Sequence, residues 1–172
     1  MKKLFMILPL VFLLCFTFSC QQGEEVAEEP VVDVEAEKAV VKALIDDFLI
    51  CWKTEDMELF SIIFAQDDDM VVFGTDAAEH FIGWEPMKES MQKQFDSLDT
   101  MQVVTRKLSI KIHKSAEVAW ISFLMDAKGE AMGEPFEFVG ARFTGVTEKR
   151  NGNWVIVQVH FSMPVAGQVI EY

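Results

Sequence analysis

The stretch Gly152–Pro164, GNWVIVQVHFSMP, decides how the fold closes. Its residues alternate with a period of two, which is typical of a strand that turns one face to the core. One side carries only apolar residues, and we expect it to be core: Val155, Val157, Val159 and Phe161. The other side carries Gln158 and His160, so it lines either the wet part of a cavity or a subunit interface. The sequence leaves both possibilities open.

The chain before this stretch predicts the other half of a hairpin. A long strand covers 136–149, and Asn151-Gly152 is a typical hairpin turn. A two-residue turn would place Phe143 opposite His160, whereas a three-residue loop with a Gly bulge would place Arg142 there. We favour the bulged loop, because it gathers polar side chains on one face and leaves the other apolar.

Further upstream the spacing of apolar residues is helical. It predicts an amphipathic helix from Glu35 to Lys53 and a shorter one capped by Asp56. Glu85-Pro86 opens a third helix, whose apolar positions are Met87, Met91, Phe95 and Leu98. Short strands are expected at 71–73 and 80–82, and longer ones at 108–112 and 118–127. Helices followed by an antiparallel meander indicate an α+β fold, in which one curved sheet packs against N-terminal helices.

Two stretches carry a family resemblance: FAQDDDMVVFGTDAAEHFIGWEPMKESMQKQF (64–95) and ARFTGVTEKRNGNWVIVQVHFSMPVAGQ (141–168). Together with the order of elements, they resemble the SnoaL-like branch of the nuclear transport factor 2-like superfamily. The resemblance covers residues 36–168 and implies a cone-shaped α+β barrel with a cavity between helices and sheet. It also implies a homodimer, since domains of this family commonly pair through the sheet. It implies no single activity, because the fold hosts enzymes and noncatalytic modules alike.

Residues 1–19 have the pattern of a signal peptide. A basic start is followed by an apolar run that is shorter than the about 20 residues of a transmembrane helix. The end of this leader, FTFSC, resembles the lipobox of bacterial lipoproteins, in which the cysteine, here Cys20, receives lipid. Thr17 departs from the usual Leu of that motif, so plain cleavage near Ser19 is the alternative.

The segment after the leader is rich in glutamate and supports lipidation. Residues 20–35 have the composition of a flexible acidic tether. We therefore expect an exported protein of the bacterial cell envelope, in which the lipid anchor on Cys20 is the only attachment to a membrane. Cys15 leaves with the leader, and Cys51 then remains as a buried structural thiol within a helix.

Composition excludes some classes of partner. The formal net charge of −13 argues against nucleic acid, whose phosphates require clustered Lys and Arg. The histidines, His80, His113 and His160, stand far apart, so we expect no metal site. Motifs for nucleotide cofactors do not occur, and we expect no cofactor. The sole tyrosine is Tyr172, so the phenol that steroid isomerases of the superfamily use has no counterpart here.

We expect a noncatalytic domain that binds a small apolar or carboxylate-bearing ligand. The candidate ligand-binding residues are Trp52, Phe73, Glu79, Trp120, Arg142, Gln158 and His160. A guanidinium on a half-buried strand could hold a ligand carboxylate, or Arg142 could pair with Glu79 or Glu137 or simply lie on an exposed strand face. The alternative is a lyase or isomerase with His160 as base and Asp69 or Glu79 as its carboxylate partner.

Overall fold

The computed structural model describes residues 32–165 and Gly167. Its elements follow the predicted order: α2 (Val34–Thr54), α3 (Met57–Ile63), β1 (Val71–Phe73), β2 (His80–Ile82), α4 (Trp84–Ser97), β3 (Leu98–Ile112), β4 (Val118–Ala131), β5 (Glu134–Arg150) and β6 (Asn153–Ser162). The predicted signal peptide and most of the predicted tether lie outside the described residues. No helix within the described residues is both long enough and apolar enough to cross a membrane.

Two of the helices begin at acidic caps. The side chain of Asp33 accepts a hydrogen bond from the backbone N–H of Ala36, and that of Asp56 accepts one from Leu59. The predicted cap of the second helix is thus confirmed. Leu98 was expected on the third helix, but its backbone is extended and it begins β3 instead, paired with Ala131.

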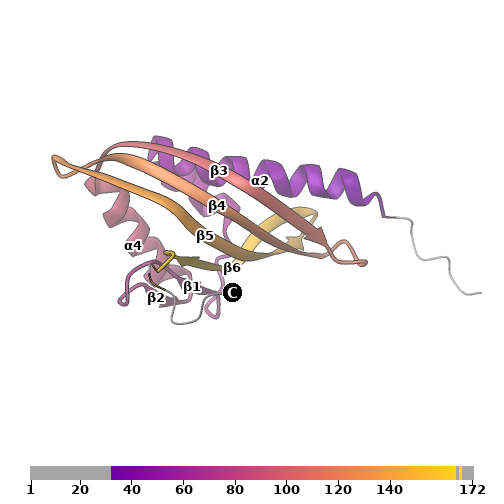
Figure 1. Cartoon of the computed structure of the whole chain (residues 1–172). Coiled ribbons are helices and arrows are strands. Elements are labelled where there is room, and N and C mark those ends of the chain that lie inside the picture. The colour runs from indigo at the N-terminus through magenta and orange to yellow at the C-terminus, as the bar shows by residue number, and fades with distance from the viewer. Residues whose placement is uncertain (1–31, 166, 168–172) are drawn as a thin grey trace, which may run out of the picture. The chain divides into compact units, whose positions relative to one another are not determined.

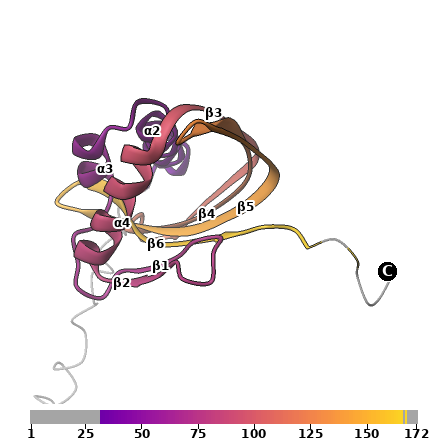
Figure 2. The same ribbon diagram turned by 90° about the vertical axis from the view of Figure 1, so that its left-hand side faces the viewer.

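The strands form a single six-stranded sheet in the order β2-β1-β6-β5-β4-β3. All neighbours are antiparallel except β1 and β6, which are parallel. The sheet is strongly curved, and the helices α2, α3 and α4 lie on its concave side (Figure 2). The long strands β3, β4 and β5 run side by side over α2 (Figure 1). This is the predicted α+β architecture, with its core between helices and sheet.

The β5–β6 hairpin differs from our preferred pairing. Its turn has two residues, Asn151 and Gly152, both with positive φ, so the preferred three-residue loop is wrong. The register then shifts at Val157, which has no partner on β5 and forms a β-bulge. As a result Thr144, and neither Phe143 nor Arg142, lies opposite His160.

The same bulge changes which residues of β6 face the core. Before it, Trp154 and Ile156 are buried; after it, Val159 is buried and His160 is exposed. One unpaired residue reverses which alternate positions of a strand point toward the core. The prediction that Val155, Val157 and Val159 share the core face is therefore wrong for Val155 and Val157. Both of these valines are only half-buried.

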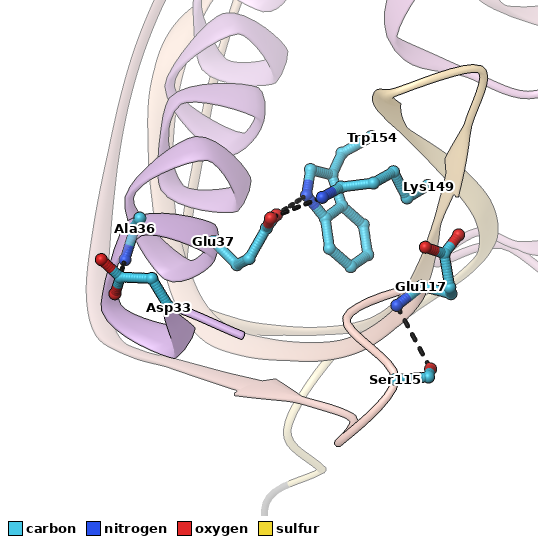
Figure 3. A network of polar contacts seen from close by, with 7 residues as sticks. All are labelled: Asp33, Ala36, Glu37, Ser115, Glu117, Lys149 and Trp154. Atoms are coloured by element: carbon cyan, nitrogen blue, oxygen red, sulfur yellow. Dashed lines mark hydrogen bonds and ion pairs between the residues drawn. The ribbon is translucent and has the colours of Figure 1, made fainter. Parts of the chain in front are cut away.

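A polar network joins the start of α2 to the tip of the β5–β6 hairpin (Figure 3). The carboxylate of Glu37 accepts hydrogen bonds from Lys149 Nζ and, at 2.7 Å, from Trp154 Nε1. The backbone N–H of Lys149 donates to the carbonyl of Glu117 in the β3–β4 turn. The hydrogen bond from Lys149, followed by that from Trp154, lowers the pKa of Glu37. The network therefore fastens the first turn of α2 to the sheet.

Candidate functional site

A cavity of about 530 Å³ lies between the helices and the concave face of the sheet. This volume falls in the range of small-molecule sites. Half of its 24 lining residues are aromatic or sulfur-containing: Phe48, Trp52, Phe60, Phe64, Phe81, Phe136, Phe138, Phe161, Met87, Met91, Met101 and Met125. The cavity therefore offers a broad apolar surface, which adaptable methionine side chains help to shape.

The polar part of the lining comes from two neighbouring segments. The β1–β2 loop contributes Thr75 and Glu79, and one side of α4 contributes Ser90, Lys93, Gln94 and Ser97. These side chains are exposed or half-buried, whereas the aromatic residues on α2 and α3 are largely buried. We therefore place the opening of the cavity between α4 and the β1–β2 loop.

The carboxylate of Glu79 is held in place at this opening. Its Oε2 accepts a hydrogen bond from the backbone N–H of Asp76 at 2.9 Å. Its side chain lies against Gly74, where an added Cβ would come within 2.2 Å of Glu79 Oε2. A larger residue at position 74 would thus displace the carboxylate, so the glycine is needed for its position.

Trp52 contributes a hydrogen-bond donor without an acceptor. Its ring lines the cavity and packs edge-on against Phe48 and Phe95, with centroid separations of 6.4 and 5.4 Å. Its Nε1 is buried and has no hydrogen-bond partner among the described residues. A buried donor left unpaired costs free energy of folding.

The structure separates the seven predicted ligand-binding residues into two groups. Trp52 and Glu79 line the cavity. The others lie outside its lining, with side chains exposed on the outer face of the sheet: Phe73, Trp120, Arg142, Gln158 and His160. The bulge in β6 is the reason for two of these placements, since it turns Gln158 and His160 away from the core.

Arg142 has none of the partners that the sequence suggested. It is exposed and forms no ion pair with Glu79, Glu137 or any other described carboxylate. The other two arginines, Arg106 and Arg150, do form ion pairs. The expectation of a carboxylate-bearing ligand rested on Arg142 in the cavity, and that support is therefore absent.

The residues of the enzymatic alternative do not converge. His160 packs against Phe73 on the outer face, and their ring centroids are 5.9 Å apart. Asp69 is exposed in the loop before β1 and does not line the cavity. Of the three residues, Glu79 alone reaches the cavity.

Two further groups contribute no chemistry to the cavity. Within the described part of the chain, no cluster of three or more His, Cys, Asp or Glu is placed to hold a metal ion. Burial raises the pKa of Cys51 to about 12, so this thiol stays protonated and unreactive at neutral pH.

A scan against protein-family models matches residues 41–166 to the SnoaL-like domain. The chain belongs to the SnoaL-like domain family. Among curated protein sequences, none matches the chain. The family resemblance in the sequence is thus confirmed over most of the residues that carried it.

Solved structures share the fold of this SnoaL-like domain at low sequence identity. A nuclear transport factor 2-like superfamily protein from Salmonella enterica superposes with a TM-score of 0.70 and 19% identity, covering 80% of this chain and 98% of that one. A proposed dehydratase from Streptomyces avermitilis gives 0.69 and 12%, covering 77% and 99%. A proposed calcium/calmodulin-dependent protein kinase II association domain from Xanthomonas campestris gives 0.62 and 21%, covering 74% and 87%. Identities this low establish the fold alone.

The polar side of α4 was missed by our reading of the sequence. Ser90, Gln94 and Ser97 follow one another at spacings of four and three residues, which places them on one side of a helix. The signal was therefore present beside the apolar positions Met87 and Met91. This row of polar residues indicated that one side of the helix faces a solvent-accessible opening and not the hydrophobic core.

Proposed function

We propose that this domain binds a small, largely apolar molecule in the cavity and carries out no reaction on it. The observation that carries the proposal is an apolar cavity without an acid–base pair. Among the described residues that line it, Glu79 is the sole carboxylate and none is a histidine. General acid–base catalysis needs a positioned donor and acceptor of protons. The other ionisable side chain of the described lining is Lys93, whose Nζ is paired with Glu89 on the surface of α4, so it is not positioned beside Glu79.

A lyase or isomerase is the weaker alternative. The structural neighbour from Streptomyces avermitilis is a proposed dehydratase, which is a lyase. Its sequence identity of 12% is too low to assign that activity to this chain. In this chain His160 would have to act from the other face of the sheet. The exposed position of its ring supports binding over catalysis.

Blocking the cavity tests the binding proposal. The probe is the neutral N-phenyl-1-naphthylamine, with fluorescence as the readout. Ser90→Trp puts a bulky ring into the lining, whereas Gln92→Trp puts the same ring on an exposed position of the same helix. We expect Ser90→Trp to abolish binding and Gln92→Trp to preserve it. Equal affinity of the Ser90→Trp and Gln92→Trp variants for the probe would contradict the proposal.

We also propose that the domain forms a homodimer through the outer face of the sheet. Large apolar side chains are exposed on three of its strands: Trp120 is 43% exposed, Phe73 42% and Ile82 59%. Apolar side chains gathered on one face mark an interaction surface more often than scattered ones do. Lipid on Cys20 would hold such a dimer at a membrane of the cell envelope, and the acidic segment 20–35 would serve as its tether.

A further inference from the structure

The polar groups of the cavity restrict the chemistry of its ligand more narrowly than its apolar walls do. We infer that the cavity selects uncharged molecules that offer a hydrogen-bond donor to Glu79, and that it rejects carboxylates. The inference rests on the proposed binding function and names the ligand class of the same site.

Glu79 sets the charge of the opening. Its Oε2 is already bound to the N–H of Asp76, and its position over Gly74 leaves it little freedom to withdraw. A ligand carboxylate at the opening would therefore meet a fixed like charge, which is unfavourable in a partly buried site. A hydroxyl or amide N–H of the ligand would instead donate to the free lone pairs of Glu79.

No cation in the described lining offsets this charge. Lys93 is the one basic residue of the lining, and its Nζ lies 2.8 Å from the carboxylate of Glu89 on the surface of α4. Arg142, which could have held a carboxylate, lies on the other face of the sheet. An anionic ligand would thus lose its hydration and could gain a partner only by drawing Lys93 away from Glu89.

Trp52 adds no second requirement. Its Nε1 has no acceptor among the described residues, but the atom is buried beyond the reach of a ligand in the cavity. Selection among uncharged ligands should therefore depend on the donor that they offer to Glu79.

Four probes of one ring system test the inference by calorimetric titration: naphthalene, 2-naphthol, 2-acetylnaphthalene and 2-naphthoate. The acetyl compound and the carboxylate have nearly the same shape and differ in charge. We expect the wild-type protein to bind 2-acetylnaphthalene about tenfold more tightly than 2-naphthoate. Glu79→Gln should shrink this ratio to about threefold or less, while Glu85→Gln, which removes an exposed carboxylate outside the lining, should leave it unchanged.

The pair naphthalene and 2-naphthol tests the hydrogen bond to Glu79 separately. The wild type should bind 2-naphthol about three- to tenfold more tightly than naphthalene, and Glu79→Ala should lose this preference, with thermal melts showing that the variant is folded. If a Glu79 variant fails to fold, the wild-type ratios still decide the inference. Tighter binding of 2-naphthoate than of 2-acetylnaphthalene by the wild type overturns it while the binding function stands. Failure of all four probes to bind overturns the binding function itself, and the inference with it.

Discussion

Thr144 lies opposite His160 where β5 pairs with β6, and Arg142 lies two residues further along, opposite Ser162. The side chains of Thr144, His160 and Arg142 are all exposed, on the outer face of the sheet. Their neighbour Phe143 points the other way, is 1% exposed and stacks on Phe123. This register places the candidate site residues of β5 and β6, Arg142 and His160, on the face of the sheet that does not line the cavity.

The adjacent residues Arg142 and Phe143 form a matched pair for stability measurements. Arg142→Ala and His160→Ala remove few buried contacts, so each should change the free energy of unfolding by about 1 kcal/mol or less. Phe143→Ala should cost about 3–5 kcal/mol, because it leaves a cavity in the core. Phe161→Ala, at a half-buried position, should cost less than Phe143→Ala. Urea denaturation of the four variants measures this, and an Arg142→Ala loss as large as that of Phe143→Ala would contradict the placement.

Deletion of Val157 should be tolerated, because this residue is the unpaired one of the β-bulge. In the deletion variant Ile156 is followed directly by Gln158, so the pairing with β5 becomes regular while Val159 stays in the core and His160 stays outside. We expect the deletion variant to keep a cooperative thermal transition, and Val157→Ala to cost only about 1 kcal/mol. A deletion variant without a cooperative transition would show that the fold needs the bend of the bulge itself.

Glu37→Gln should destabilise the domain by about 1–2 kcal/mol at neutral pH, because it removes charge-assisted hydrogen bonds from Lys149 and Trp154. The pKa of Glu37 in the folded state is lowered from 4.5, so its contribution is fully present above about that pH and is lost as the pH falls through the folded-state value. Denaturation from pH 7 to pH 3 should show the two proteins converging in acid. Glu35→Gln, at a side chain that is 81% exposed, is the control and should show a much smaller difference at neutral pH.

Trp120→Glu should convert the proposed homodimer to a monomer without unfolding it. Trp120 is 43% exposed, so a charge there costs little within one chain but would be desolvated in a sheet-to-sheet interface. Native mass spectrometry measures the oligomeric state, and Lys128→Glu, an exposed charge change elsewhere on the same strand, serves as control. Dimers of unchanged stability in the Trp120→Glu variant would exclude this part of the sheet as the interface.

Cys20→Ala should remove the lipid and release the protein from the membrane fraction. Metabolic labelling with a fatty-acid analogue in a bacterial host should mark the wild type and leave the variant unlabelled. Label retained by the variant would place the lipid elsewhere. An unlabelled wild type would favour plain cleavage near Ser19.

The sequence by itself determined the elements and their order. The cap Asp56 and the change of apolar spacing after Thr100 act locally, within a few residues, so they can be read without the fold. The family resemblance rested on the same local features and agrees with the match to the SnoaL-like domain over residues 41–166. Two members of the candidate site, Trp52 and Glu79, were also named from the sequence.

The tertiary structure alone decided which face of β6 meets the cavity. Nothing in the local sequence around Val157 predicts that this residue is unpaired. A bulge forms where it satisfies both the pairing of two strands and the packing of both sheet faces, so its position depends on the whole sheet. That one residue placed His160 outside and Val159 inside. The acceptor missing at Trp52 Nε1 likewise depends on which side chains surround it, and these come from helices and strands far apart in the sequence.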